Sequence, residues 1–227
     1  MSLFEERTIS CPQCGFKHDE QIATSLKPKF KEAILAGTFQ RFVCENCGHS
    51  YRVDDPLMYI DFTKKLWIAQ YPRDWEKDWA QYELIAKEDF DKYVTGEFAS
   101  PLAHQLAPGF IIRTVFGLDA LAEKIVILEN KIDDRLLSVL KWQMMNEVEG
   151  LTLNPNTRPM LIAVADSELV FRVLTQGVVG SEIMALPLED AFDGISENES
   201  SAWAGMLKDF AGRTYVDAGI WMFNGAG

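Results

Sequence analysis

Two short cysteine pairs constrain this chain more than any other feature of its sequence. The four cysteines are Cys11, Cys14, Cys44 and Cys47. Each pair has the spacing C-x-x-C and is followed directly by a glycine, Gly15 or Gly48, and no further cysteine occurs in the chain. Because residues 15–43 separate the pairs, any fold must bring two distant stretches together if the pairs act on one another.

The pattern is typical of a metal site with four thiolate ligands. Two cysteines three residues apart bind one metal ion when the chain between them turns tightly. Pro12 presets one backbone angle of the first turn. Gly15 and Gly48 can adopt the positive φ with which such a turn ends. We therefore expect one zinc ion held by all four cysteines, in a closed site that stabilises the fold and leaves no open position for catalysis.

Three other interpretations of the cysteines remain. Two disulfides require an oxidising compartment, which nothing in the sequence indicates. A redox C-x-x-C motif does not require a second pair with its own glycine. Iron in a rubredoxin-like site is the main rival, because the same thiolates bind it.

The length and composition are those of an ordinary globular protein. The chain has 227 residues, of which 48% are hydrophobic and 25% charged, and this is enough for one large domain or two small ones. Residues 1–9 contain charges and no apolar run, so we expect no secretory signal. No stretch has the length and hydrophobicity of a membrane span. We expect a soluble, cytoplasmic protein without membrane contact.

The net charge of −12 argues against general nucleic-acid binding. Acidic residues outnumber basic ones in each of the segments 1–55, 56–150 and 151–227, whereas phosphate binding requires clustered lysine and arginine. A local basic group does lie near the cysteines: Lys17, Lys27, Lys29, Lys31 and Arg41. A solvated helix face explains it equally simply, and a nucleic-acid-binding zinc ribbon is the weakest of the functional alternatives.

The sequence around the cysteine pairs predicts a short helix and a small antiparallel sheet. Pro28 suits the first position of a helix and Gly37 its C-cap, so we expect a helix over 28–37. The segments 38–43, 50–53, 57–62 and 66–71 have the residue types of strands, with a turn at 63–65.

These stretches resemble the bacterial CpXC family, which is named for its paired C-P-x-C motifs. The resemblance includes Cys11-Pro-Gln-Cys-Gly, Cys44-Glu-Asn-Cys-Gly and Pro56-Leu-Met-Tyr-Ile-Asp61. This chain departs from the family pattern at Glu45, where the second pair lacks proline, and at Ile60, where the family has histidine. The resemblance reaches to about residue 145. It implies bound zinc and this architecture, and, because the family is functionally uncharacterised, it implies no activity.

Helices dominate the next part of the chain. Trp75, Trp79, Tyr82 and Ala86 have helical spacing; an exposed tryptophan stripe would mark a partner surface, and a buried stripe an ordinary core face. We expect a loop carrying His104, a strand over 110–116 and helices over 120–130 and 133–148, the last capped by Asp133 and Asp134.

The C-terminal part predicts a second, smaller α+β unit. Residues 151–159 resemble a linker. Strands are expected over 160–165, 168–175 and 181–186, then helices over 188–192 and 203–210, and a last strand over 216–223. We therefore expect a zinc-ribbon-containing domain over 8–150 and a C-terminal α+β unit over 151–227. This unit would either pack on the first domain or form a separate one. The predicted fold class is α+β, a zinc-ribbon-like antiparallel sheet with an inserted helix, followed by helices and this unit.

The common catalytic motifs are absent from the sequence. It contains no Walker loop, dinucleotide fingerprint, H-E-x-x-H or G-x-S-x-G. One group of polar residues lies in or beside apolar elements and would form a charged pocket if its members converge; its members are Asp61, Arg113, Asp133, Asp134 and Arg135. Helix capping and ion pairing explain the same residues without catalysis.

The sequence therefore favours a zinc-binding structural or interaction protein with protein partners. The alternative is a hydrolase or transferase that uses the acidic and arginine cluster. We name no catalytic residue.

Overall fold

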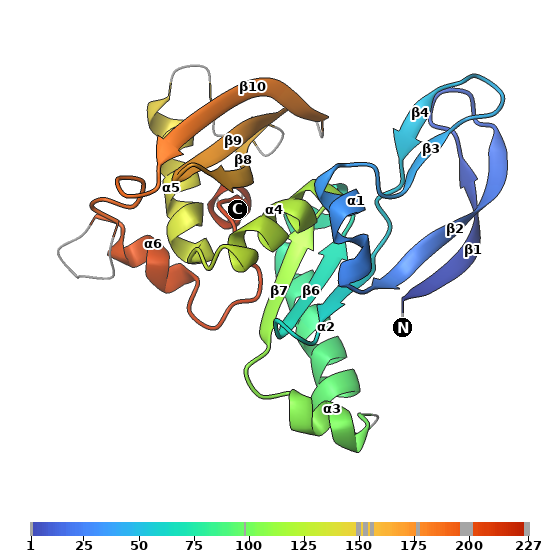
Figure 1. The fold of residues 1–227 in the computed structure, drawn as a ribbon, viewed down its shortest axis with the longest axis horizontal. Helices are drawn as coiled ribbons and strands as arrows, with labels where there is room; N and C mark the ends of the chain where they lie inside the picture. Colours follow the sequence, from blue (N-terminus) through green and yellow to red (C-terminus); the bar gives the residue numbers. More distant parts are fainter. Residues whose placement is uncertain are drawn as a thin grey trace. The chain divides into compact units, whose positions relative to one another are not determined.

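The computed structural model describes residues 2–97, 99–148, 151, 154, 157–175, 178–195 and 202–224. The fold is α+β, as the sequence predicts, and the chain forms two compact units (Figure 1). The first unit contains residues 1–75 and 84–121, and the second contains 76–83 and 122–227. The domain division at 150/151 stays a prediction of the sequence, and the two units are described separately below.

A five-stranded sheet forms the centre of the first unit. Its strands, in spatial order, are β1 (Leu3–Ser10), β2 (Lys17–Leu26), β5 (Leu57–Asp61), β6 (Leu66–Tyr71) and β7 (Ile111–Phe116). The predicted hairpin of 57–62 with 66–71 is confirmed by the antiparallel pairing of β5 with β6. Strands β1 and β2, which the sequence did not predict, are also antiparallel, whereas β2–β5 and β6–β7 are parallel. The side chains of β6 are buried along its whole length, because this strand lies inside the sheet and both of its faces are covered.

A two-stranded hairpin, β3 (Arg41–Val43) with β4 (Ser50–Arg52), accompanies this sheet. A 3-10 turn at Pro28–Phe30 and the helix α1 (Lys31–Leu35) precede the hairpin, and Gly37 ends this segment at φ 66°. The predicted helix over 28–37 is thus confirmed. The turns of the β1–β2 and β3–β4 hairpins lie side by side at the upper right of Figure 1.

The buried side chain of Gln40 connects the hairpin to the sheet. Its Oε1 accepts a hydrogen bond from the backbone N–H of Ala23 in β2 at 2.7 Å. Its Nε2 donates to the carbonyl oxygen of Val53 at 2.9 Å, and the Val53 N–H donates to the Gln40 carbonyl oxygen at 3.0 Å. Since an amide side chain must be satisfied when buried, this residue fixes where the small hairpin leaves the sheet.

One face of the sheet buries aromatic side chains against the helical part of the first unit. The helical elements after β6 are a 3-10 segment (Arg73–Asp78), α2 (Trp79–Phe90), a π-helical segment (Asp91–Thr95) and α3 (Pro101–Leu106). Residues 76–83 of these elements belong to the second unit. Trp67 of β6 packs edge-on against Phe90, with ring centroids 5.4 Å apart. Val94 completes this cluster, onto which Ile112 of β7 also packs.

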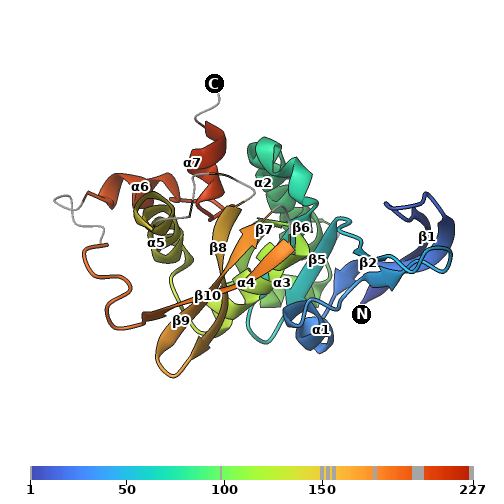
Figure 2. The same ribbon diagram turned by 90° about the horizontal axis from the view of Figure 1, so that it is seen from above.

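In its described residues, the second unit combines a three-stranded antiparallel sheet with several helices and with the first part of α2. The sheet has the order β10 (Val178–Pro187), β9 (Glu168–Thr175), β8 (Thr157–Ala165). The helices are α4 (Leu118–Glu129), whose first turn belongs to the first unit, α5 (Asp134–Glu147), α6 (Ala204–Asp209) and α7 (Gly219–Asn224). Helix α5 packs against β8 and α6, as both ribbon views show (Figures 1 and 2). The predicted hairpin turn at Asp166-Ser167 is confirmed, with both residues at positive φ.

Three local predictions were wrong. His104 lies in the short helix α3, which Ser100 caps by accepting a hydrogen bond from the Ala103 N–H, and not in an irregular loop. Residues 188–192 form turns rather than a helix. Residues 219–224, expected within a strand, form helix α7, because a short apolar run fits either structure and packing decides between them.

None of the helices in the described part of the chain is long and apolar enough to cross a membrane.

Candidate metal centre

The first cysteine pair lies in the turn between β1 and β2. Ser10 pairs with Lys17 at the end of the ladder. The Cys11 N–H donates to the carbonyl oxygen of Phe16 at 2.8 Å, and the Gly15 N–H donates to the carbonyl oxygen of Cys11 at 2.8 Å. Gly15 leaves this turn at φ 72°, a conformation that favours glycine. The turn is therefore a knuckle that directs both sulfurs to one side.

The second pair repeats this geometry between β3 and β4. The Cys44 N–H donates to the carbonyl oxygen of His49 at 2.9 Å, and the Gly48 N–H donates to that of Cys44 at 2.8 Å. Gly48 also has φ 72°. The two knuckles thus have matching hydrogen bonds and matching glycine conformations, although they differ at Pro12 and Glu45.

The four sulfurs converge on one point. All four Sγ atoms lie within 4.8 Å of one another. The separations are 3.7 Å for Cys11–Cys47 and 3.6 Å for Cys14–Cys44. A tetrahedral zinc ion with Zn–S bonds of about 2.3 Å places its sulfurs about 3.8 Å apart. The four sulfur atoms and their spacing therefore fit one metal ion bound by four thiolates. The S–S distances are far too long for disulfide bonds, in which the two sulfurs are about 2.05 Å apart.

The thiols influence one another strongly. The pKa of Cys14 is lowered to about 6, first by the hydrogen bond from the Asn46 side-chain amide, 3.6 Å away, and then by the backbone N–H of Phe16. The His49 N–H favours the thiolate of Cys47, yet desolvation and the sulfurs around it raise the pKa of Cys47 to about 12. Four thiolates this close repel one another, so they need a cation between them to be deprotonated together.

The two pairs differ in exposure. Cys11 and Cys44 are buried, and Cys14 and Cys47 are exposed. A small core lies beneath the buried pair, where Ile9, Ile22 and Tyr51 pack with Phe42 and Val53. This cluster is small for a structural core, so a bound metal would add to limited apolar packing.

The histidines lie outside the sulfur set. His18 is half-buried: its Nε2 lies 2.6 Å from the Tyr51 hydroxyl and its Nδ1 lies 3.2 Å from the Glu20 carboxylate. The ring of His49 stacks on Tyr51 with centroids 6.2 Å apart. Burial raises the pKa of Tyr51, and the neighbouring Cys11 and Cys44 add to that shift. These aromatic residues support the knuckles from one side.

The proposed polar cluster divides between the two units. Asp61 and Arg113 belong to the first unit. Asp61 caps the turn after β5, accepting hydrogen bonds from the N–H groups of Thr63 and Lys64 at 2.9 and 3.0 Å. Arg113 donates to the carbonyl oxygen of Ile112 at 2.8 Å.

The other three members lie together at the N-terminus of α5. Asp133 caps the helix and pairs with Arg135. The Nη2 of Arg135 lies 2.7 Å from the Asp133 carboxylate. Asp134 points elsewhere, and its carboxylate accepts a hydrogen bond from the buried Lys124 at 3.0 Å. A common cleft for all five residues stays a prediction; the contacts described here are capping and ion pairing.

Sequence reasoning missed a buried ion network in the second unit. Arg158 forms a two-pronged pair with Glu76 and also donates to Asp217 at 2.9 Å. Lys141 donates to Asp217 at 2.9 Å and to both oxygens of Glu123, at 3.0 and 2.9 Å. The flanking cations hold the pKa of Asp217 well below its usual range, although burial alone would raise it. No sequence signal distinguishes these residues from surface charges.

The chain is therefore an α+β protein with two knuckles whose four cysteines are close enough together to hold a metal ion. In a comparison with known protein families, the model of the CpXC family, described as "CpXC protein", matches residues 9–141, which is more than half of the chain. The chain belongs to the CpXC family. No curated protein and no solved structure matched it.

Proposed function

We propose that the four cysteines bind one zinc ion, which stabilises the fold of a protein that acts through interaction with protein partners. The observation that carries the proposal is the convergence of all four Sγ atoms within 4.8 Å, from two knuckles with the same backbone geometry. The family membership agrees with it.

A structural role follows from the closed ligand set. Four thiolates fill the tetrahedron, so no position remains for water or substrate. Iron in the same ligands is the rival, and zinc is favoured because a site that only holds structure requires no redox activity. Cytoplasmic location belongs to this proposal, since thiols that bind metal must stay reduced.

A metal ion bound by the four cysteines would stabilise the short β3–β4 hairpin. The β3–β4 hairpin has only three residues in each strand, and an isolated hairpin of this kind is marginal in water. A zinc ion would join it to the β1–β2 hairpin by bonds to both. Structural zinc contributes on the order of 10 kcal/mol to folding in small domains, which exceeds what this small core can supply.

Exposed apolar side chains beside the knuckles support an interaction role. Phe16 and Val43 flank the two cysteine turns and are 38% and 62% exposed. The tryptophans considered from sequence are weaker candidates, since Trp79 is buried and Trp75 stacks on Tyr71. The net charge of −12 disfavours nucleic acid as the partner, and we do not propose membrane binding. No contact among the residues named for the enzyme alternative supports it, because these residues cap turns and helices or form ion pairs.

The test is a set of single cysteine replacements. Cys14→Ser is expected to remove stoichiometric zinc and lower the midpoint of thermal unfolding of the first unit. Gln13→Ser is the matched control, since it places the same residue one position earlier in the same exposed turn and should leave both quantities unchanged. Retention of one zinc per chain with unchanged stability in Cys14→Ser would contradict the proposal.

A further inference from the structure

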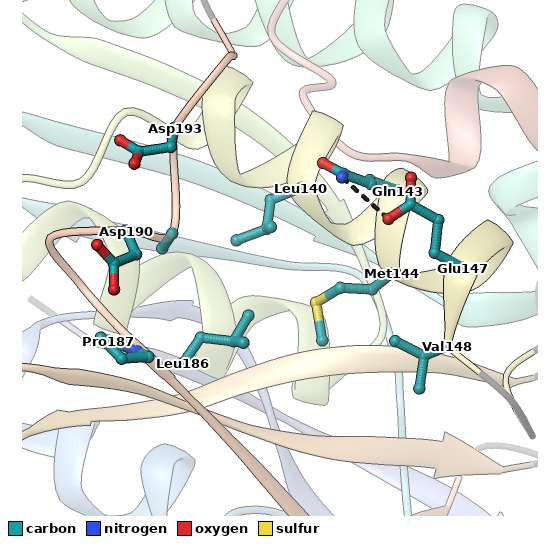
Figure 3. A pocket seen from close by; sticks show the side chains of 10 residues that line it. Leu140, Gln143, Met144, Glu147, Val148, Leu186, Pro187, Asp190 and Asp193 are labelled. Atoms are coloured by element: carbon teal, nitrogen blue, oxygen red, sulfur yellow. Dashed lines mark hydrogen bonds between the residues drawn. The ribbon is translucent and has the colours of Figure 1, made fainter.

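The second unit contains a pocket that is separate from the metal centre. It lies between α5 and the chain that follows β10, and its volume is about 270 Å³. Figure 3 shows the side chains around it: those of α5 on one side, and those of Leu186 to Asp193 on the other. All of its lining residues belong to the second unit.

The interior of the pocket is apolar. Leu140 and Met144 are four residues apart and share one face of α5, and Val148, the extended residue that ends the helix, also lines the pocket. Leu186 and Pro187, at the end of β10, face these side chains. Such a surface binds an apolar body of limited size, because pockets that hold drug-sized ligands usually have volumes of about 300 to 1,000 Å³.

Carboxylates flank this interior from both sides. Glu147 stands on the α5 side, where it accepts a hydrogen bond from Gln143 at 3.0 Å. Asp190 and Asp193 stand on the opposite side at the rim, where both are exposed and their carboxylates point away from α5 in Figure 3. None of the described residues that line the pocket is basic.

The sequence around the pocket strengthens this negative charge. No lysine or arginine occurs between Lys141 and Arg158, the stretch that supplies the α5 side. None occurs between Arg172 and Lys208 either, the stretch that supplies the other side. The acidic residues of this second stretch whose side chains the structure describes are Glu189, Asp190 and Asp193. A cation approaching this region therefore meets carboxylates without competition from neighbouring basic side chains.

We propose that this pocket binds an organic cation with an apolar body, an ammonium or guanidinium group on an alkyl or aryl stem. The stem would cover Leu140 and Met144, and the charged head would stay at the partly hydrated rim near Asp190 and Asp193. A free amine and a lysine or arginine side chain of a partner protein share this chemistry. Anionic ligands are excluded by repulsion, and neutral ones lack the rim contacts.

The experiment measures binding of three small probes that differ mainly in charge. They are 2-phenylethylamine, the neutral 2-phenylethanol and the anionic 3-phenylpropionate. Binding is followed by NMR of the full-length protein labelled at the methionine methyl groups. The Met144 signal is assigned with Met144→Leu, a substitution that conserves volume. We expect the amine to shift this signal and to bind roughly three- to tenfold more tightly than the alcohol at low salt, with the difference reduced at high salt.

Charge variants test the rim. The double variant Asp190→Asn with Asp193→Asn is expected to bring the ratio of amine to alcohol affinity close to one, while Asp78→Asn, an exposed control in the same unit, keeps the wild-type ratio. No Met144 shift with any probe, equal binding of amine and alcohol by the wild type, or tighter binding of the anion would each overturn the proposal. Titration with the blocked peptide acetyl-Gly-Arg-Gly-amide separates the sources: a Met144 shift supports a partner side chain, and its absence beside amine binding supports a free amine.

Discussion

Replacing Arg158 by methionine is expected to destabilise the second unit strongly. Arg158 is buried, and its guanidinium makes three charge-assisted contacts, two with Glu76 and one with Asp217. The carboxylates raise its pKa well above the usual value against the effect of burial. Methionine fills a similar space but removes the cation that pairs with Glu76, whose carboxylate then keeps the neutral Tyr215 hydroxyl at 2.6 Å.

The magnitude follows from the burial of the pair. Breaking a buried ion pair from one side costs about 3–5 kcal/mol, because the remaining charge is left uncompensated in a poorly hydrated place. For a chain of this length a loss of 1 kcal/mol lowers the unfolding temperature by about 2–4 °C. We therefore expect a decrease of roughly 6–20 °C.

Arg135→Met is the matched control, because it removes the same charge in the same way from a partly exposed pair. Arg135 pairs with Asp133, and their side chains are 37% and 33% exposed, so solvent screening limits the loss to about 1 kcal/mol or less. Urea unfolding of both variants measures the difference. If Arg158→Met loses no more stability than Arg135→Met, the reasoning about the buried network is wrong.

Three further predictions concern single positions. The pKa of Asp217 is held below its unfolded value, so its contribution to the stability of the fold is present above about pH 4 and is lost as pH falls further. The stability of Asp217→Asn, measured by acid unfolding, should therefore depend less on pH in this range than that of the wild type. Equal slopes of stability against pH would refute this. Gln40→Ala removes the acceptor of the Ala23 N–H and is expected to cost about 1–3 kcal/mol in urea unfolding; an unchanged midpoint would show that the bond is not needed. Gly219→Ala places a Cβ against the Tyr215 hydroxyl, so we expect a lower melting temperature by calorimetry, and an equal or higher one would contradict the packing.

The local signals in the sequence predicted that the four cysteines could share one metal ion, and the structure brings their sulfurs within 4.8 Å of one another. The cysteine spacing with its glycines, the helix start at Pro28 and the cap at Asp133 all depend on contacts between near neighbours in the chain. Such contacts leave a readable pattern, because proline, glycine and aspartate occupy these positions for conformational reasons.

The parts that the sequence did not reveal depend on contacts between distant residues. Strand β1 has only Ile9 buried and three consecutive charged residues at 5–7, so it shows no strand periodicity. The parallel pairing of β6 with β7 is set by packing across the intervening helices. Arg158 and Asp217 look like surface charges, since such residues are rarely fully buried unless paired, and both lie beyond the matched family region.

The site residues divide in the same way. The four cysteines could be assigned from spacing alone, because the ligand type and geometry of a metal site are repeated in the sequence. Gln40 and the acidic pocket beside α5 could not, since glutamine, leucine and aspartate carry no pattern specific to these roles. Their places are fixed only once the strands and helices have packed.

The most direct test of the central claim is the metal content of the purified protein, measured by elemental analysis while the four thiols are titrated with a thiol-reactive agent. The account predicts one zinc per chain, released as the cysteines of both knuckles react. A folded protein without metal, or a coloured one that contains iron, would contradict it.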